Sequence, residues 1–146
     1  MEDGLIKVKF PLENDELGIE AEWMWARWQG ENVFELDNSP FHAYGISFKD
    51  SFSIEFADDT ACFGRILRKG GHRTVRARFP FGADYETSLS VLSELKTIGC
   101  SFEGSDLERP LYSIDVPPGV ELALVVGYLA QSESEGLLEY EEADCY

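Results

Sequence analysis

The sequence has few of the residues from which catalytic and metal sites are most often built. Its 146 residues include only two histidines and three cysteines. Cys62, Cys100 and Cys145 are odd in number and widely spaced, which argues against a disulfide framework and favours reduced thiols. We expect Cys62 and Cys100 to be buried in strands and Cys145 to be exposed. His42 and His72 lie far apart, and no cysteine pair has zinc-site spacing, so we expect neither a metal nor another cofactor.

Long hydrophobic runs are also missing. The longest apolar stretch, residues 122–130, is too short to span a bilayer. No early stretch combines a basic end, an apolar run and a small-residue cleavage site. Hydrophobic residues nevertheless make up 44% of the chain, which is enough for a folded core. We therefore predict an ordered cytoplasmic protein.

Basic residues are scarce, because 12 lysines and arginines stand against 28 aspartates and glutamates, giving a net charge of −16. This excess argues against nucleic acid or an anionic membrane as the main partner. Two interpretations of the acidic excess remain open: it attracts a basic partner protein, or it only keeps the protein soluble. The C-terminal segment is especially acidic, with carboxylates at Glu133, Glu135, Glu139, Glu141, Glu142 and Asp144.

Half of the basic residues lie in one short segment, which contains Lys69 and the arginines Arg65, Arg68, Arg73, Arg76 and Arg78. Two interpretations remain open: the segment binds an anion, or it pairs internally with the acidic excess. Strand alternation places Arg76 and Arg78 on one face, where they could meet carboxylates of the terminal strand.

Residues 1–69 show the period-two alternation of β-strands. Strands are predicted over residues 5–12, 19–28, 33–36, 51–56 and 60–67. In the fourth of these, Phe52, Ile54 and Phe56 share one face. Short turns and the absence of a helical period predict a small curled β-sheet or partly open barrel.

Gly70 and Gly71 mark a boundary, and residues 70–146 alternate between element types. Strands are predicted at 72–79, 100–104, 111–116 and 137–142. One helix is predicted between Asp84 and Gly99, with Tyr85 on its apolar face, and another after residue 119. This order predicts a ferredoxin-like (βαββαβ) half, an antiparallel sheet with two helices on one face. The whole chain is therefore predicted to be an α+β protein whose two subdomains pack as one compact unit.

Three tryptophans lie in the second predicted strand. Strict alternation places Trp23 and Trp25 on one face, which we interpret as the core face. Trp28 falls near the following hairpin on the opposite face, where it is a candidate interface anchor.

The most distinctive stretch runs from Asp37-Asn38-Ser39-Pro40-Phe41 through Gly45 to Lys49-Asp50. Together with the first two strands and the segment at 71–76, it resembles a bacterial family known as domain of unknown function 4265. Lys49 stands where that pattern leads us to expect a glycine. The resemblance covers nearly the whole chain and implies a shared fold, but no activity, because the family has no assigned chemistry.

No catalytic constellation is recognisable, so the leading hypothesis is a non-enzymatic acidic binding protein. By analogy with bacterial immunity proteins, it would neutralise a basic cognate toxin through the C-terminal carboxylates and Trp28. The alternative is a small-ligand-sensing regulatory module that binds an anion at the segment 65–78. A hydrolase using His42 is a third hypothesis, although a packed loop histidine is the simpler interpretation of that residue.

Overall fold

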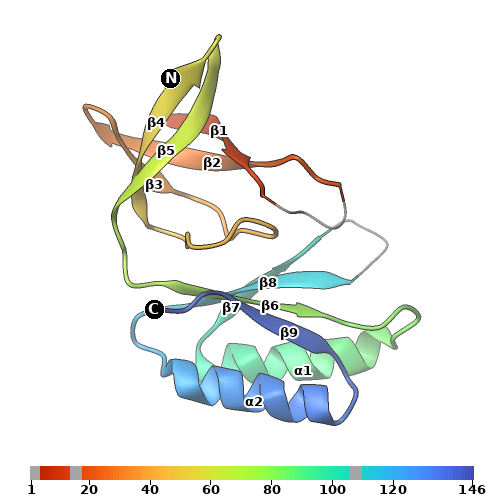
Figure 1. The fold of residues 1–146 in the computed structure, drawn as a ribbon. Helices are drawn as coiled ribbons and strands as arrows, with labels where there is room; N and C mark the ends of the chain where they lie inside the picture. The colour runs from red at the N-terminus through yellow and green to blue at the C-terminus, as the bar shows by residue number, and fades with distance from the viewer. Residues whose placement is uncertain (1–3, 14–17, 106–109) are drawn as a thin grey trace. The chain divides into compact units, whose positions relative to one another are not determined.

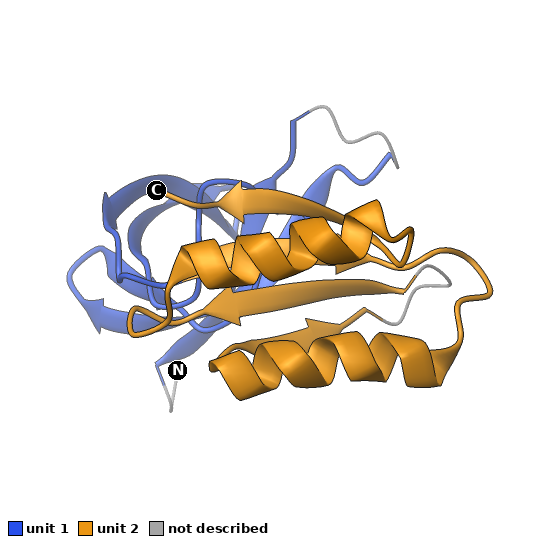
Figure 2. Ribbon diagram, turned by 90° about the horizontal axis from the view of Figure 1, so that it is seen from below, with its two compact units in different colours: residues 1–72 blue, residues 73–146 orange. Residues whose placement is uncertain are grey.

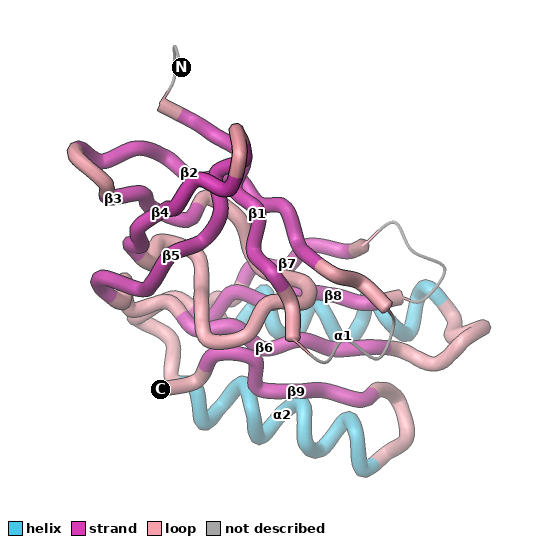
Figure 3. Tube along the Cα trace, turned by 45° about the horizontal axis from the view of Figure 1, so that its top comes forward, coloured by secondary structure: helices cyan, strands magenta, loops and turns pink. Residues whose placement is uncertain are grey.

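The computed structural model describes residues 4–13, 18–105 and 110–146. The chain divides into two compact units, residues 1–72 and 73–146 (Figure 2). The division falls close to Gly70-Gly71. Both helices belong to the second unit (Figure 3), and the predicted α+β class is confirmed.

Unit 1 is a closed five-stranded barrel (Figure 1). Its strands are β1 (Leu5–Pro11), β2 (Ala21–Gly30), β3 (Val33–Leu36), β4 (Ser51–Ala57) and β5 (Thr60–Arg68). Consecutive strands pair antiparallel, and the barrel closes where β1 runs parallel to β5, with Lys9 opposite Cys62. The predicted N-terminal barrel is therefore present, although it is closed rather than partly open.

Phenylalanine rings fill the barrel interior. Phe10, Phe52 and Phe63 contact one another, with ring centroids 5.2–5.7 Å apart. The loop between β3 and β4 adds the buried side chains of Ala43 and Ile46 to this cluster. These buried side chains explain why a loop rich in turn-forming residues also carries so many apolar side chains.

The expectation that Trp23 and Trp25 belong to the core was wrong. Met24 and Ala26 occupy the inner face of β2, whereas Trp23 and Trp25 are 49% and 43% exposed. Both sets of alternate residues on this strand are largely apolar, so alternation alone does not identify the inner face. The smaller side chains of Met24 and Ala26 are the ones accommodated beside the phenylalanine rings.

Unit 2 contains a four-stranded antiparallel sheet in the order β7-β8-β6-β9. Its elements are β6 (Arg73–Arg78), α1 (Tyr85–Ile98), β7 (Ser101–Gly104), β8 (Leu111–Val116), α2 (Leu122–Ser134) and β9 (Glu139–Asp144). Both helices lie on one face of the sheet (Figure 1). Across the described ranges, neither helix is long and apolar enough to cross a membrane.

The core of unit 2 lies between the sheet and the helices. Val75 and Ile114 from the sheet pack in one buried cluster with Leu92, Leu95 and Leu129 from the helices. The carboxylate of the N-cap Asp84 accepts from the Glu86 N–H at 3.3 Å, and α1 ends at Gly99, whose φ is +121°. Both residues were expected to delimit this helix, and their roles are confirmed.

Candidate functional site

The loop formed by residues 37–50 is held by the buried carboxylate of Asp50. Its Oδ2 accepts from the Ser47 N–H at 2.8 Å and from the Lys69 ammonium at 2.5 Å, while its Oδ1 accepts from the Gly70 N–H at 2.8 Å. Lys69 also donates to the Gly45 carbonyl. Asp50 thus ties this loop to the end of β5.

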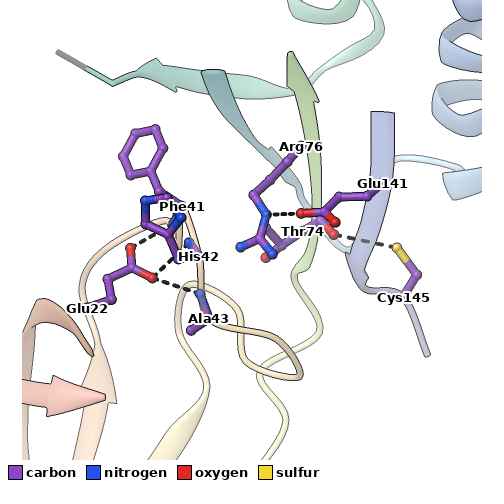
Figure 4. Close-up of polar contacts among 8 residues, drawn as sticks. All are labelled: Glu22, Phe41, His42, Ala43, Thr74, Arg76, Glu141 and Cys145. Carbon is purple, nitrogen blue, oxygen red and sulfur yellow. Dashed lines mark hydrogen bonds and ion pairs between the residues drawn. The ribbon is translucent and has the colours of Figure 1, made fainter. Parts of the chain in front are cut away.

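A second carboxylate, that of Glu22 on β2, holds the middle of the same loop (Figure 4). Its Oε2 accepts from the Phe41 N–H at 2.7 Å, and its Oε1 accepts from the His42 and Ala43 N–H groups at 2.9 and 2.8 Å. Three successive amides of this kind would otherwise suit an external anion. Because the chain supplies its own carboxylate, we interpret this most distinctive stretch of the sequence as a scaffold.

Lys49 adopts a left-handed backbone conformation, with φ of +71°. This geometry explains why a glycine was expected there, since a Cβ is strained in that region. We predict that Lys49→Gly stabilises unit 1 by about 0.5–1 kcal/mol, measured by urea unfolding. Lys49→Ala loses the same ammonium but keeps a Cβ, so it should give no gain. Equal stability of the two variants would contradict the explanation.

Arg76 and Arg78 on β6 pair with the terminal strand, as the alternation suggested. Arg76 Nε lies 2.8 Å from Glu141 Oε1 (Figure 4), and Arg78 Nη2 lies 2.8 Å from Glu139 Oε2. The strand register sets both contacts, because β6 and β9 place each arginine opposite its glutamate. Two candidate partner-binding carboxylates and two candidate anion-binding arginines therefore neutralise one another.

The other arginines of the segment have separate environments. Arg73 donates to the carbonyls of Pro117 and Val120, at 3.4 and 2.8 Å, and so fixes the turn before α2. Its Nε is buried, and none of the described residues accepts a hydrogen bond from it. Arg65 and Arg68 are exposed on β5, in unit 1. The five candidate anion-binding arginines are thus divided between the two units.

The remaining candidate carboxylates are spread along α2 and β9. Glu133 accepts from the Tyr140 N–H at 3.0 Å, and Glu135 accepts from the Gln131 amide at 2.9 Å. Asp144 is only 8% exposed, whereas Glu142 is exposed. The terminal acids therefore differ in their hydrogen-bond partners and in their exposure.

Trp28 is half exposed, as expected of an interface anchor. It lies near the hairpin between β2 and β3, where its indole N–H donates to the Glu31 carbonyl at 2.8 Å. The hydrogen bond fixes the orientation of the ring.

An open groove of about 450 Å³ lies between α1 and α2. Three carboxylates line it: Asp84 and Glu86 from the start of α1, and Glu135 from the end of α2. The polar lining continues through Thr87 and Gln131. In the described part of the chain, no basic side chain lines this groove.

Tyr128 adds a hydrogen-bonding group to the groove. Its hydroxyl donates to the Val91 carbonyl at 3.3 Å. Burial raises the pKa of Tyr128, and the nearby Glu94 carboxylate raises it further. The hydroxyl is therefore uncharged at neutral pH. The negative charge of the groove comes from its carboxylates alone.

Sequence reasoning identified Glu135 but missed Asp84 and Glu86 as site residues. Asp84 was recognised only as a helix cap, and nothing in its local pattern relates it to the C-terminal acids. The packing of α1 beside α2 brings these carboxylates to one groove. The sequence held one weak signal. When two consecutive helices pack antiparallel, acidic residues at the start of the first helix lie close to acidic residues at the end of the second.

The cysteines differ in environment and do not suggest a nucleophile. Cys100 is 4% exposed, and burial followed by the Asp115 carboxylate raises its pKa to about 11. Burial and then Glu142 also raise the pKa of Cys145, whose thiol donates to the Thr74 carbonyl. Cys145 is therefore less exposed than a terminal residue was expected to be, and Cys62, expected to be buried, is half-buried.

We predict that iodoacetamide at pH 8 alkylates Cys62 before Cys145 and Cys100. A thiol with a pKa of about 11 has roughly a hundredfold less thiolate at that pH than one with its ordinary value of 9.0. Peptide mass spectrometry measures the order, with the urea-unfolded chain as the control in which the differences disappear. Because the folded pKa is raised, the contribution of Cys100 to stability is present below pH 9 and is lost as the pH rises towards 11.

No group of three or more histidine, cysteine or acidic side chains within the described ranges could hold a metal ion. His42 is half-buried in the loop fixed by Glu22, in keeping with a packed histidine.

Comparisons with known proteins identify the family. The fold is similar to the crystal structure of a hypothetical protein from Neisseria gonorrhoeae, with a TM-score of 0.80, 18% identity, and coverage of 94% of this chain and 93% of that chain. At that identity the likeness shows the fold alone. No curated protein matches. The family model described as a domain of unknown function, DUF4265, matches residues 22–140, and the chain therefore belongs to the DUF4265 family.

Proposed function

We propose that this protein is a non-enzymatic cytoplasmic binding protein that holds a basic partner protein in the groove between α1 and α2. The observation that carries the proposal is a groove lined by Asp84, Glu86 and Glu135 without a basic side chain among its lining residues. The net charge of −16 supports the same polarity over a longer range. Such a field steers a basic protein towards the surface and raises its association rate.

The groove offers more than charge. Val91, Tyr128 and Leu137 supply apolar surface among the carboxylates. Exposed ion pairs contribute only about 0.2–1 kcal/mol each, so charge alone does not account for tight binding. We infer that lysine or arginine side chains of the partner place their ammonium or guanidinium groups at the carboxylates and their aliphatic stems on the apolar lining.

The contacts of the acidic residues change which of them we propose as binding groups. Glu139 and Glu141 are paired with arginines, so they contribute less to an external partner than their number suggests. Glu135 lies in the groove, while Glu133 and Glu142 are exposed near the end of α2 and on β9. We therefore propose Glu135 as the central member of the original set, with Asp84 and Glu86 added.

We infer that the partner is a bacterial toxin and that the protein acts as its immunity-type inhibitor. The support is an analogy of type: a small, strongly acidic chain that would occlude a basic active site. The anion-sensing alternative is less well supported. Arg76 and Arg78 are neutralised by glutamates and Arg73 is engaged with two carbonyls.

We also infer that unit 2 is a ferredoxin-like fold. Its element order is β6-α1-β7-β8-α2-β9, and the strand order β7-β8-β6-β9 places the first and third strands at the centre. The antiparallel pairing and the two helices on one face support the same assignment.

Affinity capture from the native host tests the proposal. The protein is immobilised, bound proteins are identified by mass spectrometry, and elution is compared at low and high salt. We expect one stoichiometric basic protein that high salt releases. Recovery of no basic partner, or of one whose retention does not depend on salt, would contradict the proposed acidic-surface mechanism.

A further inference from the structure

Two tryptophans and two lysines form an exposed surface on the outside of the barrel. Trp23 and Trp25 on β2 lie directly opposite Lys9 and Lys7 on β1. The Lys7 ammonium is 4.9 Å from the centre of the Trp25 ring, and the Lys9 ammonium is 6.0 Å from that of Trp23. We call these four residues the Trp–Lys ladder.

The ladder has the composition of an interaction surface. Large, half-exposed indoles are the side chains most enriched among residues that dominate binding energy. Neither indole is needed to fill the barrel, because Met24 and Ala26 occupy the inner face of β2. Their exposure is therefore not a by-product of core packing.

The charge of the ladder is opposite to that of the chain. Among the described residues, the ammonium groups of Lys7 and Lys9 have no carboxylate within ion-pair distance, although the chain contains 28 acidic residues. They lie over indole faces instead. A partner that brings carboxylates would therefore meet two lysines that no acidic side chain of the described chain neutralises.

We propose that the Trp–Lys ladder binds an extended acidic segment of a partner protein, in which every second residue is a glutamate. Side chains on one face of a strand repeat every two residues, about 6.6–6.8 Å, and an extended peptide has the same repeat, with its intervening side chains on the opposite face. The glutamates that face the ladder can pair their carboxylates with Lys7 and Lys9 and pack their aliphatic stems on the indoles. This surface is distinct from the groove and takes a ligand of the opposite charge.

The surroundings favour a peptide docked through its side chains. β1 is paired with β2 and β5, and β2 with β1 and β3, so neither strand presents a free edge for strand addition. A single-stranded nucleic acid could also use aromatic and basic groups. It carries a charge at every nucleotide, however, which the net charge of −16 opposes more strongly than the spaced carboxylates of a peptide.

Fluorescence anisotropy with an eight-residue labelled peptide of alternating glutamate and serine tests the proposal on the full chain. We expect saturable binding to the wild type and a Kd about tenfold higher for Trp25→Ala and for the double variant Lys7→Gln, Lys9→Gln. Phe56→Ala and Lys96→Gln, which remove an exposed aromatic ring and a lysine elsewhere, should change the Kd by less than about twofold. Circular dichroism verifies that each variant is folded.

The proposal would be overturned by no binding of the peptide at millimolar concentration, by an equal loss in the Phe56→Ala control, or by tighter binding of an oligothymidylate than of the peptide. Sedimentation measures self-association of the wild type and of Trp25→Ala. Self-association that is lost in Trp25→Ala would also overturn the proposal, because it would assign the ladder to a second copy of the chain.

Discussion

Asp50→Ala is expected to destabilise the barrel by about 3 kcal/mol or more, one of the two largest effects in this protein. The carboxylate is fully buried and accepts hydrogen bonds from two backbone amides and from Lys69. Its removal leaves the amides of Ser47 and Gly70 without their acceptor and the Lys69 ammonium without its counter-charge. Lys69 keeps some solvent contact, which places the estimate at the lower end of the range for a broken buried pair.

Urea unfolding followed by tryptophan fluorescence measures this effect in unit 1, because all three tryptophans lie in β2. Circular dichroism at the helical wavelength follows unit 2, which contains both helices. Asp59→Ala, an exposed aspartate in the β4–β5 turn, is the control and should change stability by less than about 0.5 kcal/mol. A fluorescence midpoint for Asp50→Ala equal to that of Asp59→Ala would contradict the assigned role.

Phe52→Ala is expected to cost about 3–5 kcal/mol. The Phe52 ring is fully buried, and its centroid lies 5.3 Å from that of Phe10, 5.7 Å from that of Phe63 and 6.4 Å from that of Phe34. Truncation removes these contacts and leaves a cavity that a closed barrel cannot readily collapse. The same fluorescence-detected unfolding provides the measurement.

Phe56 provides a matched control on the same strand. It was expected to share the inner face with Phe52, but it is 72% exposed near the turn at the end of β4. Phe56→Ala should therefore change stability by less than about 0.5 kcal/mol. Comparable losses for Phe52→Ala and Phe56→Ala would show that the interior of the barrel is assigned incorrectly.

Most elements of this fold follow from local sequence patterns. Period-two alternation located the strands, and Asp84 and Gly99 delimited α1, because capping groups and positive-φ positions are local requirements. The pairing of Arg76 and Arg78 with the terminal strand was one of the two interpretations that the sequence left open. It required only alternation and the assumption that β6 and β9 are neighbours, which the register shows.

The inner face of β2 was not predictable in the same way. Tryptophans alternate there with methionine and alanine, so both faces are apolar and the volume available inside the closed barrel decides between them. Tyr85 on α1 is a similar case: it was assigned to the apolar face, yet it is 67% exposed, and the core face is formed by Val91, Leu92 and Leu95.

The candidate site was the least accessible part from sequence alone. The terminal acids were evident as a cluster along the chain, but the structure pairs Glu139 and Glu141 with arginines and buries Asp144. It brings Glu135 to Asp84 and Glu86 instead. Such a grouping depends on which helix faces pack together, and this long-range property has no counterpart in the local charge pattern.

The most direct test of the central claim is the affinity of the captured basic partner for two triple variants, measured by isothermal titration calorimetry at low and high salt. Asp84→Asn, Glu86→Gln and Glu135→Gln neutralise the groove while keeping a good N-cap on α1. Glu31→Gln, Asp58→Asn and Asp59→Asn remove the same charge from unit 1. The proposal predicts about tenfold weaker binding and a smaller salt dependence for the groove variant alone. Equal affinities of the two variants for the partner would contradict it.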